Sequence, residues 1–313
     1  MATRATSFWG FAYAMTAAAW LAVFTGPVAA QDRSVTSAPA TTEALEIITE
    51  SDIEYTRIGD QPLKLDLARP KAPGKYPGVI CIHGGGWRAG NKSSHIALTR
   101  RLAKEGFVAI TVQYRFAPKD RFPAQIDDVR CAVRWLRANA QQLQLDPERI
   151  GAIGFSAGGH LSLLLGVMED KDRPATDACH GEQSSKVQAV VNYFGPADLR
   201  SHYPDMVRGI LSDFLGGLPD EKPEEAKAAS PITYIDGDDA PILTFHGTED
   251  KIVPYEQAEL LSRVCKKAGL PHRLETLEGA GHGWGGEQMV ETLDKSIAFF
   301  REKLAQPVPA SSE

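Results

Sequence analysis

The residues Gly154-Phe155-Ser156-Ala157-Gly158 decide the fold of this chain, because they form a G-x-S-x-G pattern between an expected strand and an expected helix. Such a junction needs a sharp turn, and the flanking glycines let the strand and helix backbones approach closely. The turn exposes the Ser156 hydroxyl at the helix N-terminus, where developing negative charge is favoured. The pattern predicts an activated serine; a tight turn with an idle hydroxyl is the alternative.

Strands and amphipathic helices alternate on both sides of this junction. The expected strands are 63–67, 78–83, 107–113, 149–155, 187–193, 242–245 and 272–277, and the expected helices are 93–106, 126–136, 157–168, 255–268 and 290–304. This alternation predicts an α/β fold, a mostly parallel central sheet with helices on both faces and sites at the carboxyl ends of its strands. The stretch at about 196–240 has several Gly, Pro and Asp residues, so we expect a small lid-like insertion there, which forms a lid or a wall of the substrate site.

A run of glycines, His83-Gly84-Gly85-Gly86-Trp87, follows the strongest early strand. The backbone N–H groups of Gly85 and Gly86 are unobstructed, and with the N–H of Ala157 they are predicted to form an oxyanion hole. A phosphate-binding loop is the alternative, but no Lys-Ser or Lys-Thr follows in the required register.

A reactive serine needs a histidine base and a carboxylate that orients it, and in this class of fold the order along the chain is serine, acid, histidine. Asp250 and His282 each follow an expected strand in that order. We therefore predict a catalytic triad of Ser156, Asp250 and His282, with Glu249 as the rival acid. Trp87, Phe155 and Trp284, which adjoin these motifs, are predicted to bind the substrate.

With these motifs the sequence resembles the α/β-hydrolase superfamily, in its esterase branch with an HGGG oxyanion loop. The stretches 114–118, 122–128 and 133–137 are also similar to the bifunctional feruloyl and acetyl xylan esterases, which are related to the hormone-sensitive-lipase-like group. Phe155 departs from that last group, which usually has aspartate before the serine.

The resemblance implies the α/β-hydrolase fold and a serine carboxylic-ester hydrolase that works through an acyl-enzyme, with no metal and no organic cofactor. The implied substrates are small-molecule or polysaccharide esters, with acetyl or feruloyl groups on a carbohydrate. A small serine aminopeptidase of the same fold and a catalytically silent binding protein are the alternatives. The oligomeric state stays open.

Composition and the N-terminal sequence predict the partners and the location of the protein. The 313 residues carry 40 acidic against 34 basic side chains, a net charge of −6, which argues against a nucleic-acid partner. An uncharged run over 8–24, followed by Val28-Ala29-Ala30, predicts a signal peptide over 1–30 and a secreted or periplasmic protein without stable membrane insertion after cleavage. An uncleaved membrane anchor is the alternative, although the run is short for a membrane span. A flexible linker over 31–48, a catalytic domain over 49–306 and a disordered tail over 307–313 complete the predicted organisation.

The oxidation state of the cysteines depends on that location. The sequence contains four, Cys81, Cys131, Cys179 and Cys265, without the C-x-x-C spacing that indicates zinc. After export they allow up to two disulfides, whereas buried free thiols are the alternative, and the sequence does not decide between them.

Overall fold

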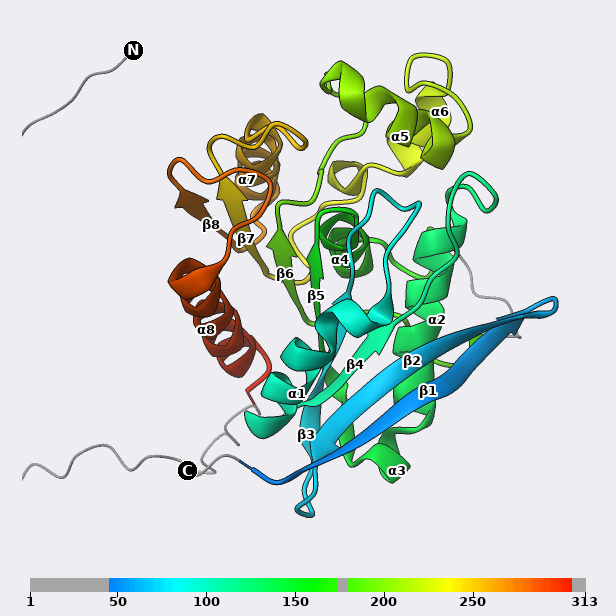
Figure 1. Cartoon of the computed structure of the whole chain (residues 1–313), viewed down its shortest axis with the longest axis vertical. Helices are drawn as coiled ribbons and strands as arrows, with labels where there is room; N and C mark the ends of the chain where they lie inside the picture. Colours follow the sequence, from blue (N-terminus) through cyan, green and yellow to red (C-terminus); the bar gives the residue numbers. More distant parts are fainter. Residues whose placement is uncertain (1–44, 174–178, 306–313) are drawn as a thin grey trace, which may run out of the picture. The chain divides into compact units, whose positions relative to one another are not determined.

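A computed structural model describes residues 45–173 and 179–305, which form a layered α/β structure (Figure 1). The predicted signal peptide over 1–30 and the predicted tail over 307–313 lie outside the described residues, as does most of the predicted linker over 31–48. Among the described residues, no helix has the length and apolar character needed to cross a membrane.

The centre is a sheet of eight strands in the order β1-β2-β4-β3-β5-β6-β7-β8. The strands are β1 (Ile47–Ile58), β2 (Gln61–Pro70), β3 (Tyr76–Ile82), β4 (Val108–Val112), β5 (Leu145–Phe155), β6 (Ala189–Tyr193), β7 (Ile242–Gly247) and β8 (His272–Leu277). β2 pairs antiparallel with β1 and β4, and all other neighbours run parallel. The predicted mostly parallel sheet is confirmed.

The helices are α1 (Ile96–Lys104), α2 (Ala124–Ala138), α3 (Ala140–Leu143), α4 (Ala157–Val167), α5 (Asp205–Leu215), α6 (Pro223–Ala228), α7 (Glu256–Ala268) and α8 (Gly286–Lys303). Helices cover both faces, so the central strands are apolar on both sides. Along β3, Val79 and Cys81 join a buried cluster with α1 and α8, while Ile80 and Ile82 join a second cluster with α2, α4 and α7. For this reason the sequence of the strand is a continuous apolar run rather than an alternating one.

Two predicted boundaries were wrong. The predicted linker over 31–48 extends too far, because β1 begins at Ile47, where it pairs with Pro70 of β2. The helix expected from Ser93 starts as a 3₁₀ turn, Lys92–His95, and becomes α-helical at Ile96. Asn91 caps that turn, with its side-chain oxygen accepting a hydrogen bond from the Ser93 N–H.

The stretch at 196–240 lies between β6 and β7. It contains α5, α6 and a 3₁₀ turn at Pro231–Thr233. Figure 1 shows α5 and α6 beyond the carboxyl ends of the central strands. Its end is fixed to α4, because the Ala229 carbonyl accepts a hydrogen bond from His160 at 2.7 Å. Within the insertion, Ser230 accepts a hydrogen bond from the Leu199 N–H at 2.9 Å.

All four cysteines are free thiols in this structure, with Cys81, Cys131 and Cys265 buried and Cys179 partly buried. Burial raises the pKa of Cys81 to about 12, so that side chain stays protonated and packs as a small hydrophobe. The sequence allowed either disulfides or free thiols, and the structure has free thiols.

One buried ion pair holds the loop after β4 against α2. Asp128 is almost fully buried and accepts two hydrogen bonds from the Arg115 guanidinium, from Nη2 at 2.7 Å and from Nε at 2.9 Å. It also accepts one from the Arg115 backbone N–H at 2.8 Å. Its neighbour Asp127 pairs instead with Arg173, and both of those side chains are about one-third exposed.

We expect Asp128→Asn to lower the free energy of unfolding by about 3 kcal/mol, because it leaves the Arg115 charge without its buried partner. Asp127→Asn is the matched control and should cost less than about 1 kcal/mol, as exposed pairs do. Urea unfolding followed by circular dichroism measures both, and equal losses in the two variants would contradict the assignment.

Candidate active site

Ser156 lies at the turn between β5 and α4, with a backbone φ of 55° and ψ of −119°. Few non-glycine residues adopt a positive φ, so the surroundings must hold this turn in place. A Cβ on Gly154 would lie 2.1 Å from the Gly158 carbonyl oxygen, and a Cβ on Gly158 would lie 2.0 Å from the Ile82 carbonyl oxygen. Both positions therefore require glycine, as the G-x-S-x-G pattern predicted.

His282 and Asp250 meet Ser156 in a chain of hydrogen bonds. His282 Nε2 is 2.8 Å from Ser156 Oγ, and His282 Nδ1 is 2.7 Å from Asp250 Oδ2. A carboxylate can only accept hydrogen bonds, so Nδ1 carries the ring proton and Nε2 presents its lone pair to the serine hydroxyl. Strand ends far apart in sequence thus bring the three predicted residues together.

The Asp250 side chain is buried and fully paired. Its Oδ1 accepts hydrogen bonds from the N–H groups of Ile252 and Val253, at 2.8 and 2.9 Å. Burial by itself raises the pKa of Asp250, but hydrogen bonds with His246 and His282 outweigh it and hold the pKa well below the ordinary value. The group is therefore a carboxylate at neutral pH and favours a positively charged imidazole beside it.

Two residues near the Asp250 side chain, Glu249 and His246, have other contacts. Glu249, the rival acid, makes no hydrogen bond with His282 in the described part of the chain; its backbone N–H donates to the Ala280 carbonyl at 2.9 Å. His246 Nε2 lies 2.8 Å from the Val253 carbonyl oxygen and 3.4 Å from Asp250. His246 thus supports the loop that carries Asp250.

Residues 83–91, the glycine loop, lie beside the serine turn. A Cβ on Gly84 would lie 2.8 Å from the Phe155 carbonyl oxygen, and Gly85 and Gly86 both have positive φ, 114° and 59°. Gly85, Gly86 and Ala157 line one cavity with Ser156 and His282. None of the hydrogen bonds found in the described residues uses the N–H of Gly85, Gly86 or Ala157, so these donors are free to bind an oxygen in that cavity.

Trp87 and His160 anchor the glycine loop to α4. Trp87 has a φ of 57°, and its indole N–H donates to His160 Nδ1 at 3.2 Å. Burial lowers the pKa of His160 to about 4, so the ring is neutral, accepts from Trp87 and donates to the Ala229 carbonyl. The Trp87 ring also stacks on Phe214 of α5, with centroids 4.2 Å apart. One buried histidine thereby joins the glycine loop to the insertion.

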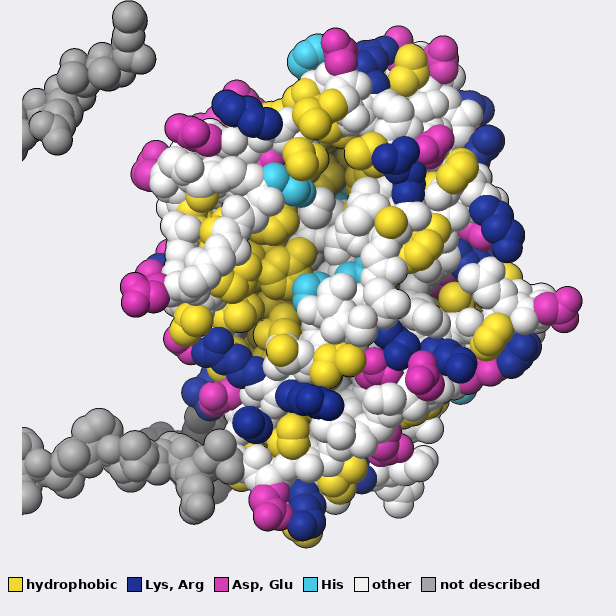
Figure 2. All heavy atoms as spheres, in the orientation of Figure 1, with side chains coloured by type: hydrophobic (Ala, Val, Ile, Leu, Met, Phe, Trp, Pro, Cys, Tyr) yellow, Lys and Arg dark blue, Asp and Glu magenta, His cyan; other side chains and the backbone are white. Residues whose placement is uncertain are grey.

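The cavity at Ser156, here called the serine cavity, has a volume of about 400 Å³. On the face shown in Figure 2, hydrophobic side chains gather in a hollow bordered by histidine side chains. Two of the residues predicted to bind substrate, Trp87 and Phe155, lie in the wall of the serine cavity. The third, Trp284, lies outside this wall, and its ring packs on Phe194 and Tyr193. The insertion at 196–240 lines the serine cavity, as expected, through Tyr203, Val207, Ile210 and Leu211, which the sequence did not single out. Phe194 and Val253, which lie outside the insertion, were missed.

A signal for part of that wall is present in the sequence. Val207, Ile210 and Leu211 have the i, i+3, i+4 spacing of one helical face. They lie on α5, and Ile210 comes so close to the glycine loop that a Cβ on Gly86 would lie 2.9 Å from it.

In the described residues, no group of three or more His, Cys, Asp or Glu side chains could hold a metal ion.

Comparison with known proteins places this geometry in a family. The profile of the BD-FAE family matches residues 65–264. The chain belongs to the BD-FAE family. The esterase LipC of Mycobacterium tuberculosis is 35% identical over 237 residues, which cover 72% of this chain and 58% of LipC. This BD-FAE chain spans about half the length of the curated relatives it matches.

Solved structures share the α/β-hydrolase fold of this BD-FAE chain. A truncated carbohydrate esterase from gut microbiota has a TM-score of 0.72 at 29% identity, covering 85% of this chain and 99% of that one. The propionate-bound esterase Est2 of Thermogutta terrifontis has a TM-score of 0.70 at 29% identity, covering 86% and 98%. A bifunctional GH43-CE protein of Bacteroides eggerthii has a TM-score of 0.70 at 33% identity, covering 82% and 38%.

We expect a fluorophosphonate probe to attach covalently to Ser156 of the BD-FAE chain, because His282 can take the proton of this hydroxyl and the free N–H groups can bind the phosphonyl oxygen. Ser162, on the same helix, is the internal control, since it is buried and its hydroxyl donates to the Gly158 carbonyl. Peptide mass spectrometry locates the probe. Labelling elsewhere, with Ser156 unmodified, would contradict the geometry.

Proposed function

We propose that the protein is a carboxylesterase that hydrolyses small acyl esters through a covalent acyl-enzyme. One observation carries the proposal: the hydrogen-bonded chain from Asp250 through His282 to Ser156 opens into a cavity that also contains free backbone N–H donors. Each of these groups has a defined task in acyl transfer, and no other described cavity combines them.

In the proposed mechanism, His282 Nε2 takes the proton of Ser156 as Oγ attacks the ester carbonyl. The N–H groups of Gly85, Gly86 and Ala157 then stabilise the oxyanion, each donor contributing about 10²–10³ in rate. Asp250 fixes the ring tautomer and stabilises the imidazolium. His282 returns the proton to the departing alcohol, and the same groups then activate water to release the acid.

The lining of the serine cavity favours an ester over an N-terminal peptide. An aminopeptidase must bind the ammonium group of its substrate, and a carboxylate is the side chain that does so. No Asp or Glu lines the serine cavity in the described residues. Its wall of Val207, Ile210 and Leu211 instead suits an apolar acyl group.

Acetyl or feruloyl esters of a carbohydrate are the proposed substrates. Two structural relatives support this class by their names, the gut carbohydrate esterase and the bifunctional GH43-CE protein. The serine cavity of about 400 Å³ has room for an aromatic acyl group as well as an acetyl group. Export to the periplasm or beyond, proposed from the sequence over 1–30, would bring the enzyme to such polysaccharides.

We predict that Ser156→Ala abolishes hydrolysis of p-nitrophenyl acetate, because the nucleophile is lost, while the circular dichroism spectrum is unchanged. Asp250→Asn should lower kcat by about 10³–10⁴, because an amide no longer enforces the required tautomer. Glu249→Gln is the matched control and should keep kcat within about twofold, since Glu249 makes no hydrogen bond with His282. Full activity in folded Ser156→Ala would overturn the mechanism.

The pH dependence of the rate should show no titration of Asp250. Because the pKa of Asp250 is held well below its ordinary value, the group stays a carboxylate, and kcat/KM should have no step near the ordinary aspartate pKa of about 3.9. A pH profile of kcat/KM for p-nitrophenyl acetate measures this. A step at that ordinary value, assigned to Asp250 by its loss in Asp250→Asn, would contradict the pairing.

A further inference from the structure

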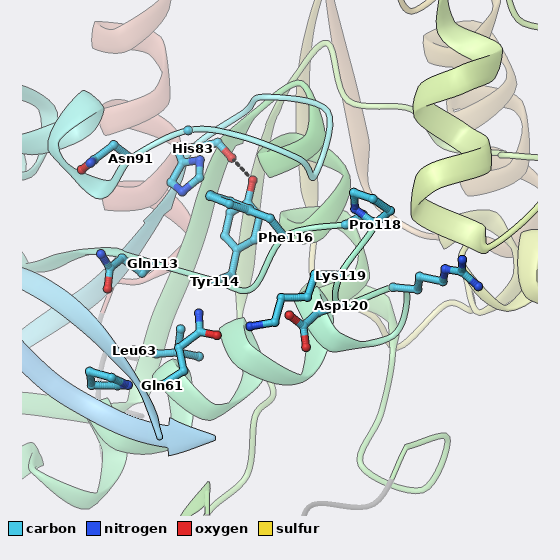
Figure 3. Close-up of a pocket in the computed structure, with 14 residues that line it drawn as sticks. Gln61, Leu63, His83, Asn91, Gln113, Tyr114, Phe116, Pro118, Lys119 and Asp120 are labelled. Carbon is cyan, nitrogen blue, oxygen red and sulfur yellow. Dashed lines mark hydrogen bonds between the residues drawn. The ribbon is translucent and has the colours of Figure 1, made fainter. Parts of the chain in front are cut away.

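A second cavity of about 750 Å³ lies beside the glycine loop (Figure 3). Its walls come from the start of β2, from His83, Gly90 and Asn91 of the glycine loop, and from residues 113–121 after β4. β4 pairs with β3, which leads into the glycine loop, so this cavity and the serine cavity border the same loop. Gly84–Trp87 line the serine cavity, whereas Gly90 and Asn91 line the second.

Aromatic rings form part of the second cavity. The Tyr114 ring stacks on His83, with centroids 4.4 Å apart and planes 18° from parallel, and Phe116 packs edge-on against both. Tyr114 is held in place, because its hydroxyl donates to the His83 carbonyl at 2.9 Å (Figure 3). The half-exposed edge of the cluster at Phe116 offers a rigid apolar surface.

Amide side chains provide oriented donors around these rings. The side-chain amide oxygen of Gln113 accepts a hydrogen bond from the Lys64 backbone N–H at 3.0 Å. The side-chain amide oxygen of Asn91 accepts one from the Ser93 backbone N–H at 2.9 Å. Both carbonyl ends are therefore occupied, which leaves the NH₂ ends as free donors. The Gln61 amide and the Lys119 ammonium group make no hydrogen bond among the described residues, and Figure 3 shows both side chains in the wall of the cavity.

The second cavity therefore differs in chemistry from the serine cavity. It combines neutral amides, the Asp120 carboxylate, the Lys119 ammonium group and the Arg121 side chain with aromatic carbon. The Asp120 carboxylate lies 3.7 Å from the Arg115 guanidinium, and the Arg121 guanidinium lies beside Gly216 of the insertion. A sugar ring matches this set, because its hydroxyl groups both accept and donate hydrogen bonds while its C–H face packs on an aromatic ring. A purely apolar acyl chain would leave the amide donors unpaired, at a cost in binding free energy.

We propose that the second cavity binds a neutral sugar unit of the substrate, on the alcohol side of the ester whose acyl group fills the serine cavity. The inference rests on the proposed function and names its substrate class. A chain of several sugar units passes over the glycine loop and reaches both cavities, whereas the ester of a small alcohol reaches only the serine cavity. The second cavity thus selects glycan esters over small esters.

The kinetic test compares acetylated xylo-oligosaccharides with p-nitrophenyl acetate. The double variant Gln61→Ala/Lys119→Ala should raise KM for the oligosaccharides about tenfold, because two hydrogen bonds are lost, with kcat unchanged and p-nitrophenyl acetate turnover within about twofold of wild type. The matched control is Gln288→Ala/Lys267→Ala, which changes an exposed glutamine and an exposed lysine away from both cavities. An oligosaccharide KM unchanged in the first double variant would overturn the inference.

A binding test separates this inference from the proposed function. The full chain carrying Ser156→Ala is titrated in a calorimeter with unmodified xylotetraose, cellotetraose and mannotetraose. We expect at least one to bind, and the added Gln61→Ala/Lys119→Ala changes to weaken that binding about tenfold. Absence of binding by all three would overturn the inference even if p-nitrophenyl acetate is hydrolysed. Absence of ester hydrolysis by the wild type would overturn the proposed function and not the binding result.

Discussion

The positive φ of Ser156 is the constraint on which the rest of the site depends. That turn is tolerated only because Gly154 and Gly158 allow backbones to touch where any side chain would collide. The same close approach brings α4 against the carbonyl of Ile82, the last residue of β3, so the glycine loop that follows β3 starts beside the serine. The nucleophile and the N–H donors are thus positioned by one piece of packing, before any substrate binds.

Two buried side chains near this turn, Asp250 and His160, differ in charge because their hydrogen-bond partners differ. Asp250 is removed from water yet stays ionised, since two backbone N–H groups and His282 occupy its oxygens. The histidine therefore faces the serine with one tautomer. His160 fixes the position of the glycine loop without carrying a charge. Its neutral ring accepts a hydrogen bond from Trp87 and donates one to the Ala229 carbonyl of the insertion. The rigid sheet edge holds the reacting groups, and the insertion supplies the wall around them.

Most of this arrangement could be predicted from the sequence, because local patterns encode it. The order of the motifs along the chain predicted that His282 meets a carboxylate at 249–250, with Asp250 favoured over Glu249, and the glycine spacing predicted the turn at Ser156. The sequence predicted a substrate wall in 196–240 but not the helix α5 that forms it, since Gly and Pro residues surround this short helix and its partners are distant in sequence. The position of Trp284 behind Phe194 and the pairing of Ile47 with β2 also depend on tertiary contacts that no local pattern carries.

Trapping the acyl-enzyme tests the central claim most directly. The wild-type protein is mixed rapidly with p-nitrophenyl acetate, quenched in acid during the first turnover, and digested for mass spectrometry. The expected result is a burst of p-nitrophenol equivalent to the active sites, with one acetyl group on the peptide that contains Ser156. A burst with the acetyl group on another residue, or steady hydrolysis in which Ser156 never carries an acyl group, would contradict a serine nucleophile at this turn.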